Sequence, residues 1–189
     1  MRILVTGGAG MLGQKLVERL ASDGVLGGRT ITAVQLTDVI TPTAPAAPFP
    51  IDLTTADLSS PGETDKLVAD KPDVIFHLAA VLSGESEVDF EKGYRVNVDG
   101  TRNLLDAIRG LADHTPRVVY ASSIAVFGSP LPEVIDDDHL SSPQTSYGTQ
   151  KAIGELLLAD YTRRGLLDGV GLRLPTLSVR PGAPNKAAS

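Results

Sequence analysis

Short apolar runs alternate along the chain with stretches in which apolar residues recur every three or four positions. The apolar runs predict β-strands and the helical spacing predicts α-helices. The predicted strands cover residues 2–6, 30–37, 49–52, 73–82, 117–122 and 169–174. Helices are predicted directly after the first strand, over residues 61–69 and 85–112, and from residue 147 onward. This alternation predicts an α/β fold with a doubly wound parallel sheet, in which the first strand is central and helices cover both faces.

Four segments have no such pattern. Residues 24–29 are a glycine-rich turn, residues 41–50 are rich in proline and alanine, and residues 128–145 are rich in proline, aspartate and serine. Residues 175–189 form a polar tail. Because the alternation resumes after residue 50, we interpret the proline-rich segment as an exposed connection and expect residues 1–189 to form one domain.

Three glycines separate the first predicted strand from the first predicted helix. Gly7 permits a tight turn, Gly10 has no side chain to block a pyrophosphate, and Gly13 lets the helix pack against the strand. The backbone amides of Met11 and Leu12 then face the phosphates at the positive end of the helix dipole. A glycine triplet also fits an ordinary tight turn, but its place between strand and helix favours the dinucleotide site of a Rossmann fold.

Acidic residues accompany the next two predicted strands. Asp38 ends the second strand, where an acid accepts hydrogen bonds from the adenosine ribose and repels a 2′-phosphate. No arginine follows Asp38, so NAD is favoured over NADP. Asp52 and Leu53 are candidates for the place beside the adenine amino group. For both aspartates the alternative is a residue that only caps a turn.

Composition and charge argue against several partners. The 189 residues are 42% hydrophobic, which is typical of a globular chain. A net charge of −6 without a basic cluster argues against nucleic acid and anionic membranes. The longest apolar run, residues 74–82, is too short for a bilayer, and the first strand starts at residue 2, so we expect no signal peptide. The lack of cysteine excludes disulfides and thiol-bound metals and fits the cytoplasm.

Ser123, Tyr147 and Lys151 form a second group of candidate residues. Ser123 follows the fifth strand, at the edge where open α/β sheets bind ligands. Tyr147 and Lys151 lie one helical turn apart on the same face. We expect the ammonium to lower the tyrosine pKa, so that Tyr147 moves a proton while hydride is exchanged with a nicotinamide. The Tyr-Lys spacing alone is typical of a helix surface, but the serine and the glycine turn favour catalysis.

Two polar residues interrupt otherwise apolar predicted elements. His77 lies in the fourth strand, and we interpret it as a core histidine with satisfied polar atoms rather than a catalyst. No second histidine lies near enough to suggest a metal site. Asn97 lies inside a predicted helix, where asparagine is mildly unfavourable, and such a breach often marks a functional position. The alternative is an exposed asparagine without a role.

Together these motifs resemble the extended short-chain dehydrogenases/reductases, the superfamily of NAD-dependent sugar-nucleotide epimerases and dehydratases. The matching pieces, in family order, are residues 6–13, Asp38, and residues 77–80, 97–101, 122–128, 147–151 and 173–176. The resemblance implies that NAD is the cofactor and that Ser123, Tyr147 and Lys151 are catalytic. It implies that Asn97 stabilises the placement of Lys151 and helps to bind NAD. The other implied cofactor contacts are Leu78, Ala79, Ala80 and Pro175.

Within that superfamily, residues 81–84, 131–134 and 172–189 are similar to the D-erythronate dehydrogenases. This similarity implies NAD-dependent oxidation of a small four-carbon hydroxy acid at C2. A carboxylate beside the reacting carbon calls for a cation or hydrogen-bond donors, and a guanidinium can hold it in two parallel hydrogen bonds. Arg180 is the candidate, with an ion pair at the surface or between domains as the alternative. The candidates for contact with the substrate hydroxyls are Ser83, Ser123, Tyr147 and Thr176.

Two other functions remain open. One is epimerisation or dehydration of a nucleotide sugar with NAD retained through the cycle. The other is a non-catalytic NAD(P)-binding sensor, against which Tyr147 and Lys151 count. Members of the superfamily are longer than this chain, so we expect most of the substrate-binding part to be missing. The expected ligand is a small molecule, and a homodimer is the candidate assembly.

Overall fold

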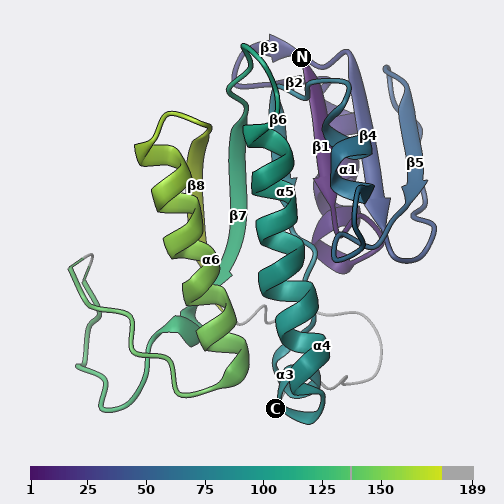
Figure 1. Cartoon of the computed structure of the whole chain (residues 1–189). Helices are drawn as coiled ribbons and strands as arrows, with labels where there is room; N and C mark the ends of the chain where they lie inside the picture. The colour runs from purple at the N-terminus through teal and green to yellow at the C-terminus, as the bar shows by residue number, and fades with distance from the viewer. Residues whose placement is uncertain (137, 176–189) are drawn as a thin grey trace.

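The computed structural model describes residues 1–136 and 138–175. Its main sheet has six strands in the order β5-β4-β1-β6-β7-β8 (Figure 1). All five neighbouring pairs are parallel. The strands are β1 (Arg2–Thr6), β4 (Ala33–Asp38), β5 (Ile51–Thr55), β6 (Val74–His77), β7 (Arg117–Ser123) and β8 (Asp168–Leu174). The predicted doubly wound sheet with a central first strand is therefore confirmed.

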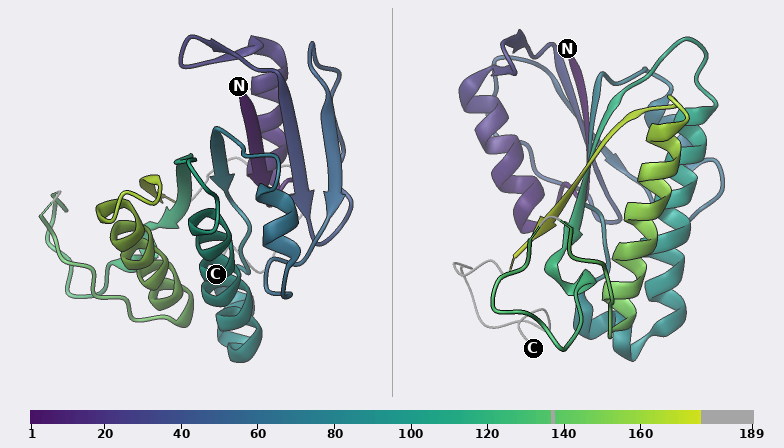
Figure 2. Two further views of the ribbon diagram at one scale, coloured as in Figure 1. Left: turned by 45° about the horizontal axis from the view of Figure 1, so that its top comes forward. Right: turned by 90° about the vertical axis from the view of Figure 1, so that its left-hand side faces the viewer.

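Helices cover both faces of the sheet (Figure 2). One face carries α1 (Met11–Asp23), and the other carries α2 (Glu63–Val68), α5 (Gly100–Arg109) and α6 (Ser146–Arg163). The central strand β1 contributes to two cores because successive side chains of a strand point to opposite faces. Ile3 and Val5 belong to the core under α1, whereas Leu4 belongs to the core under α5.

The second predicted strand begins later than its apolar run suggested. Residues 30–37 were expected as one strand, but β4 begins at Ala33. Thr30 instead belongs to β3 (Arg29–Thr30), which pairs antiparallel with β2 (Val25–Leu26). Gly27 and Gly28 join the two strands, and both have positive φ angles, of 55° and 77°. Two consecutive positive φ angles favour a tight hairpin. The start of the apolar run therefore forms a strand of this hairpin instead of the first part of β4.

The predicted helix over residues 85–112 is not continuous. It is divided into α3 (Ser83–Val88), α4 (Phe90–Tyr94), a π-helical turn η1 (Arg95–Asp99), and α5. Asp89 causes the first break, because its side chain accepts a hydrogen bond from the Lys92 amide at 3.0 Å and so caps a new helix. The predicted strand over residues 73–82 is also shorter than expected and ends at His77.

Helix α6 begins where a cap fixes its start. The Thr145 side chain accepts a hydrogen bond from the Gly148 amide at 3.0 Å, which is the geometry of an N-cap. This cap places Tyr147 in the first turn of the helix. Across the described residues, every helix is too short or too polar to cross a membrane.

Candidate active site

The glycine turn forms at the carboxyl end of β1. Gly7 has a φ angle of 76°, which side-chain-bearing residues rarely adopt. A Cβ on Gly7 would lie 2.7 Å from the Ala79 nitrogen, and a Cβ on Gly13 would overlap the Gly7 carbonyl oxygen. The turn is therefore packed tightly against α1 on one side and against the segment after β6 on the other. Gly10 is exposed directly before α1, and Met11 and Leu12 occupy its half-buried first turn.

Asp38 joins the end of β4 to the glycine turn. Its Oδ2 accepts a hydrogen bond from the Ala9 amide at 2.9 Å, and its Oδ1 accepts one from the Val39 amide at 2.7 Å. The second bond is a local cap, as the alternative interpretation proposed. The first bond reaches across to the turn, so the carboxylate lies beside the predicted phosphate site.

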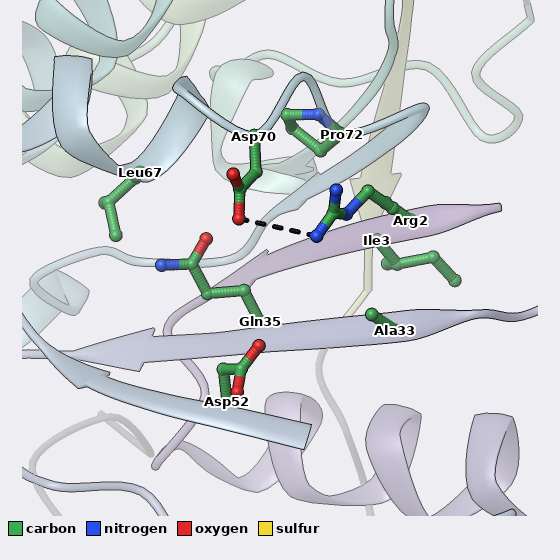
Figure 3. A pocket seen from close by; sticks show the side chains of 8 residues that line it. All are labelled: Arg2, Ile3, Ala33, Gln35, Asp52, Leu67, Asp70 and Pro72. Atoms are coloured by element: carbon green, nitrogen blue, oxygen red, sulfur yellow. Dashed lines mark ion pairs between the residues drawn. The ribbon is translucent and has the colours of Figure 1, made fainter. Parts of the chain in front are cut away.

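Asp52 does not lie where the adenine assignment requires. It pairs in register with Gln35 and lines a cavity that also contains Arg2 and Asp70 (Figure 3). Arg2 is the first residue of β1, so this cavity lies at the amino end of the sheet. Cofactors bind across the carboxyl ends of such strands, so the Asp52 assignment is wrong. Leu53 is exposed in the middle of edge strand β5 and does not reach that end either.

A second Asp-Leu pair, at residues 57–58, follows the carboxyl end of β5 and was missed. Hydrogen bonds from the hydroxyl and the amide of Ser59 hold the pKa of Asp57 below its usual value. Arg95 also donates a hydrogen bond to this carboxylate at 3.3 Å. The prediction failed because the third strand was placed too early, over residues 49–52 instead of Ile51–Thr55. Had the third strand been predicted to end at residue 55, Asp57 would have been the candidate for the place beside the adenine.

The segment after β6 lies against the glycine turn. The Leu78 amide donates a hydrogen bond to the Thr6 carbonyl at 3.1 Å, which places Leu78, Ala79 and Ala80 at the carboxyl edge of the sheet. His77 precedes them and is fully satisfied, because Nδ1 contacts the Thr6 hydroxyl at 2.8 Å and Nε2 contacts the Thr101 hydroxyl at 2.9 Å. Burial, reinforced by the nearby charge of Lys151, lowers the pKa of His77 to about 3. The interpretation of His77 as a core histidine is confirmed.

Asn97 is buried at the centre of the π-helical turn, so the alternative of an exposed asparagine is wrong. Its side chain accepts a hydrogen bond from the Val81 amide at 2.7 Å and donates one to the Val81 carbonyl at 3.0 Å. It also donates to Oε1 of Gln150 at 2.7 Å. Single π-turns inside α-helices occur often at functional sites. Here the turn orients the Asn97 side chain so that its hydrogen bonds link the segment after β6 to α6, the helix that carries Lys151.

Gln150 was not predicted from the sequence. It is fully buried on α6, directly before Lys151, and holds that helix against Asn97. Glutamine is a good helix former, so its presence breaks no local preference and gives no signal.

Ser123, Tyr147 and Lys151 are brought together where β7 meets α6. Ser123 is the last residue of β7, and Tyr147 and Lys151 occupy the first two turns of α6. Lys151 is 2% exposed, donates a hydrogen bond to the Ala121 carbonyl at 2.8 Å, and lies 5.7 Å from the centre of the Tyr147 ring. The serine hydroxyl is close enough to Tyr147 to favour the phenolate. This arrangement provides a proton-transfer group, an oxygen-binding hydroxyl and a buried cation.

The pKa expected for Tyr147 is corrected by the structure. Lys151 was expected to lower it, but burial raises the pKa of Tyr147, and only the nearby Ser123 hydroxyl opposes that effect. Burial also lowers the pKa of Lys151 to about 8. Both changes have the same cause, because a site with little water disfavours the charged form of each group.

Residues 3–186 match the NAD dependent epimerase/dehydratase family. The chain belongs to this family. A solved structure of a nucleoside-diphosphate-sugar epimerase from Agrobacterium tumefaciens is 59% identical with a TM-score of 0.96, and the match covers 100% of this chain and 56% of that one. D-erythronate dehydrogenase of Cupriavidus necator is 49% identical over 100% of this chain and 59% of its own length.

The UDP-glucose 4-epimerase of Brucella ovis, solved in complex with NAD, is 33% identical with a TM-score of 0.76. That match covers 91% of this chain and 51% of the epimerase. The chain therefore spans between half and two thirds of the length of these members of the NAD dependent epimerase/dehydratase family.

NAD is the cofactor of this family, and the geometry fits it. The glycine turn leaves backbone amides uncovered at the start of α1, where the helix dipole favours phosphate. A side chain on Gly7 or Gly13 would collide with the backbone packed around this turn and so distort the cradle. Asp38 supplies an acid beside the turn, as a ribose requires.

Of the four remaining predicted site residues, two lie within the described part of the structure and two lie outside it. Ser83 is the half-buried first residue of α3, and Pro175 directly follows β8. Thr176 and Arg180 lie outside the described residues. In the described ranges, no group of three or more histidine, aspartate or glutamate residues is arranged to hold a metal ion.

Proposed function

We propose that the protein containing this chain is an NAD-dependent dehydrogenase that oxidises C2 of a small sugar acid resembling D-erythronate. The proposal rests on the meeting of Ser123, Tyr147 and Lys151 at the edge of the sheet that also carries the glycine turn, in a chain 49% identical to a D-erythronate dehydrogenase. Residues 1–189 are the proposed NAD-binding domain, and most of the substrate-binding part is proposed to lie beyond residue 189.

In the proposed reaction, Tyr147 takes the proton of the C2 hydroxyl and Ser123 donates a hydrogen bond to the same oxygen. NAD, when bound, supplies the hydride acceptor. Burial dominates the resting pKa of Tyr147, and the proposed role of the Lys151 ammonium is to stabilise the phenolate as it forms during the reaction. Asn97 and Gln150 are proposed to hold the helix in place. Gly7, Gly10, Met11 and Leu12 are the proposed contacts of the pyrophosphate, and Asp38 is the proposed contact of the adenosine ribose. The other proposed cofactor contacts are Leu78, Ala79, Ala80, Asn97, Tyr147, Lys151 and Pro175.

Epimerisation of a nucleotide sugar is the second candidate function. It is favoured by the 59% identity to a protein described as a nucleoside-diphosphate-sugar epimerase. The same tyrosine would begin that reaction, but the hydride would return to the sugar and no NADH would accumulate. A non-catalytic NAD(P) sensor is the third alternative, and the assembled Tyr147 and Lys151 weigh against it.

One assay distinguishes the three functions. The complete protein is mixed with NAD⁺ and either sugar acids or nucleotide sugars, and NADH is followed by absorbance. We expect NADH with a four-carbon sugar acid. An epimerised UDP-sugar without net NADH would replace the proposal with the second candidate, and NAD binding without turnover would favour the sensor.

We predict that Asp38→Ala weakens NAD binding and relaxes the rejection of NADP. The carboxylate repels a 2′-phosphate, and its loss also removes the acceptor for the Ala9 amide. Asp38→Asn is the matched control, because it keeps an oxygen for Ala9 but loses the charge. Dissociation constants for both cofactors give the result. A wild-type protein that uses NADP as well as NAD contradicts the assignment.

We predict that Arg180→Lys raises KM for the sugar acid and leaves NAD affinity unchanged. A guanidinium binds a carboxylate through two parallel hydrogen bonds, whereas an ammonium acts as a point charge. Steady-state kinetics with both substrates measure the change. If KM for the acid does not change, Arg180 is not its ligand. Ser83 and Thr176 are the proposed contacts of the substrate hydroxyls.

The cytoplasm is the proposed compartment, and the lack of cysteine in these 189 residues supports it. A homodimer is the proposed assembly of the complete protein. Light scattering on that protein tests the assembly, and a monomer at all concentrations would contradict it.

A further inference from the structure

Lys151 carries a buried charge that makes few stabilising contacts with the described residues. Its ammonium makes one hydrogen bond, to the Ala121 carbonyl, and burial is the only influence that moves its pKa. In the described residues no carboxylate raises that pKa. Unpaired buried charges are costly, so a protein contact that favours the charged form of this lysine has a large effect on its pKa.

The ring of Tyr120 lies under this ammonium. Nζ of Lys151 is 4.9 Å from the centre of the Tyr120 ring, nearer than the 5.7 Å to the centre of the Tyr147 ring. Both distances fall within the range in which an aromatic face attracts a cation. Tyr120 is 1% exposed, and this attraction is stronger when water is excluded.

The hydroxyl of Tyr120 does not explain why a tyrosine occupies this position. It is buried and has no hydrogen-bond partner among the described residues. Such an unsatisfied group costs free energy, so the benefit must come from the ring. Helix α6 is shaped around that ring, because a Cβ on Gly154 would overlap the hydroxyl and lie 2.6 Å from Cζ. Gly154 follows Lys151 by one helical turn, so the same face of α6 presents the cation and makes room for the ring.

We propose that Tyr120 is a positioning residue whose aromatic face holds the Lys151 ammonium in its charged form and at a fixed distance from Tyr147. The proposal rests on the proposed function only for its catalytic consequence. The ring acts through Lys151 and does not touch the reacting atoms.

Other titratable groups near the ammonium do not replace the ring. His77 on β6 stays neutral, because burial lowers its pKa to about 3. Burial raises the pKa of Tyr120 well above its usual value, so this hydroxyl is neutral too. Tyr147 on α6 is neutral for the same reason. The Glu155 carboxylate, also on α6, is bound by Ser122 at 2.5 Å and by Arg173 at 2.8 Å.

The expected effect is a shift in the protonation of Lys151. Losing a desolvated cation–π contact is expected to lower the Lys151 pKa by about one unit, a tenfold change in its protonation constant. Because the proposed reaction needs charged Lys151, activity at alkaline pH is then lost about one unit earlier.

The test replaces Tyr120 in the complete protein by phenylalanine and by phenylalanine analogues with increasing fluorination. These side chains have similar shapes, but fluorine weakens the negative face of the ring. Carbon-13-labelled lysine, assigned with Lys151→Arg, lets NMR titration report the Lys151 pKa without any turnover. Tyr120→Phe should keep that pKa within a few tenths of a unit. Each added fluorine should lower it, and Tyr120→Leu should lower it about one unit.

A Lys151 pKa that does not change along the fluorinated series overturns the proposal. Tyr120→Leu leaves a smaller side chain in the core and risks misfolding, but the fluorinated series does not depend on it. The pH profile of kcat/KM is then measured for the same variants. Its alkaline limb should move with the NMR pKa. If the pKa series holds but no substrate yields NADH, the proposed function fails while the role of Tyr120 stands.

Discussion

Tyr147→Phe is expected to lower turnover by about two to four orders of magnitude, the usual loss when a general acid–base is removed. The substitution deletes one hydroxyl and keeps the ring that packs in the first turn of α6. NAD affinity should change little, because the ring and the neighbouring Lys151 remain. The measurements are single-turnover NADH formation and a direct NAD titration.

Tyr161→Phe is the matched control for this experiment. Tyr161 lies on the same helix and donates a hydrogen bond to Asp106 at 2.6 Å, away from the glycine turn. Its loss should reduce stability slightly and leave turnover near the wild-type rate. A Tyr147→Phe protein that works at the wild-type rate would remove tyrosine from the mechanism.

Much of this site was predictable because local spacing determines it. Gly7, Gly10 and Gly13 lie between a strand and a helix, and Tyr147 and Lys151 share a helical face wherever a helix forms. The parallel sheet then brings the ends of β1, β4 and β7 to one edge. The apolar pattern is enough to predict that sheet.

The predictions that failed concern features that depend on tertiary structure. The pKa of Tyr147 depends on burial, which sequence spacing does not give, so the expected influence of Lys151 was overestimated. Asp52 was chosen over Asp57 because a strand boundary was misplaced by a few residues, and such boundaries depend on pairing with β4. The break at Asp89 arises from side-chain capping. The π-turn contains the buried Asn97, whose hydrogen bonds reach distant segments, and the apolar spacing of this stretch is nearly continuous across both features.

Gly13→Ala is expected to reduce NAD affinity about ten- to a hundredfold, because overpacking costs about 1–3 kcal/mol and each step of about 1.4 kcal/mol is tenfold in affinity. In an ordinary helix this change would stabilise the protein by about 1 kcal/mol. Here the new Cβ would overlap the Gly7 carbonyl and lie 2.8 Å from the Gly8 Cα. Both are backbone atoms, which cannot rotate away, so either α1 or the glycine turn must move.

The clash should outweigh helix propensity, because overpacking costs about 1–3 kcal/mol. Lys15→Ala is the matched control, since Lys15 lies on the exposed face of α1 and its loss leaves the turn unchanged. Isothermal titration with NAD and thermal unfolding without NAD separate the two effects. We expect Gly13→Ala to lose affinity and Lys15→Ala to keep it. If Gly13→Ala keeps its affinity and gains stability, the close packing of α1 against the turn does not shape the cofactor site.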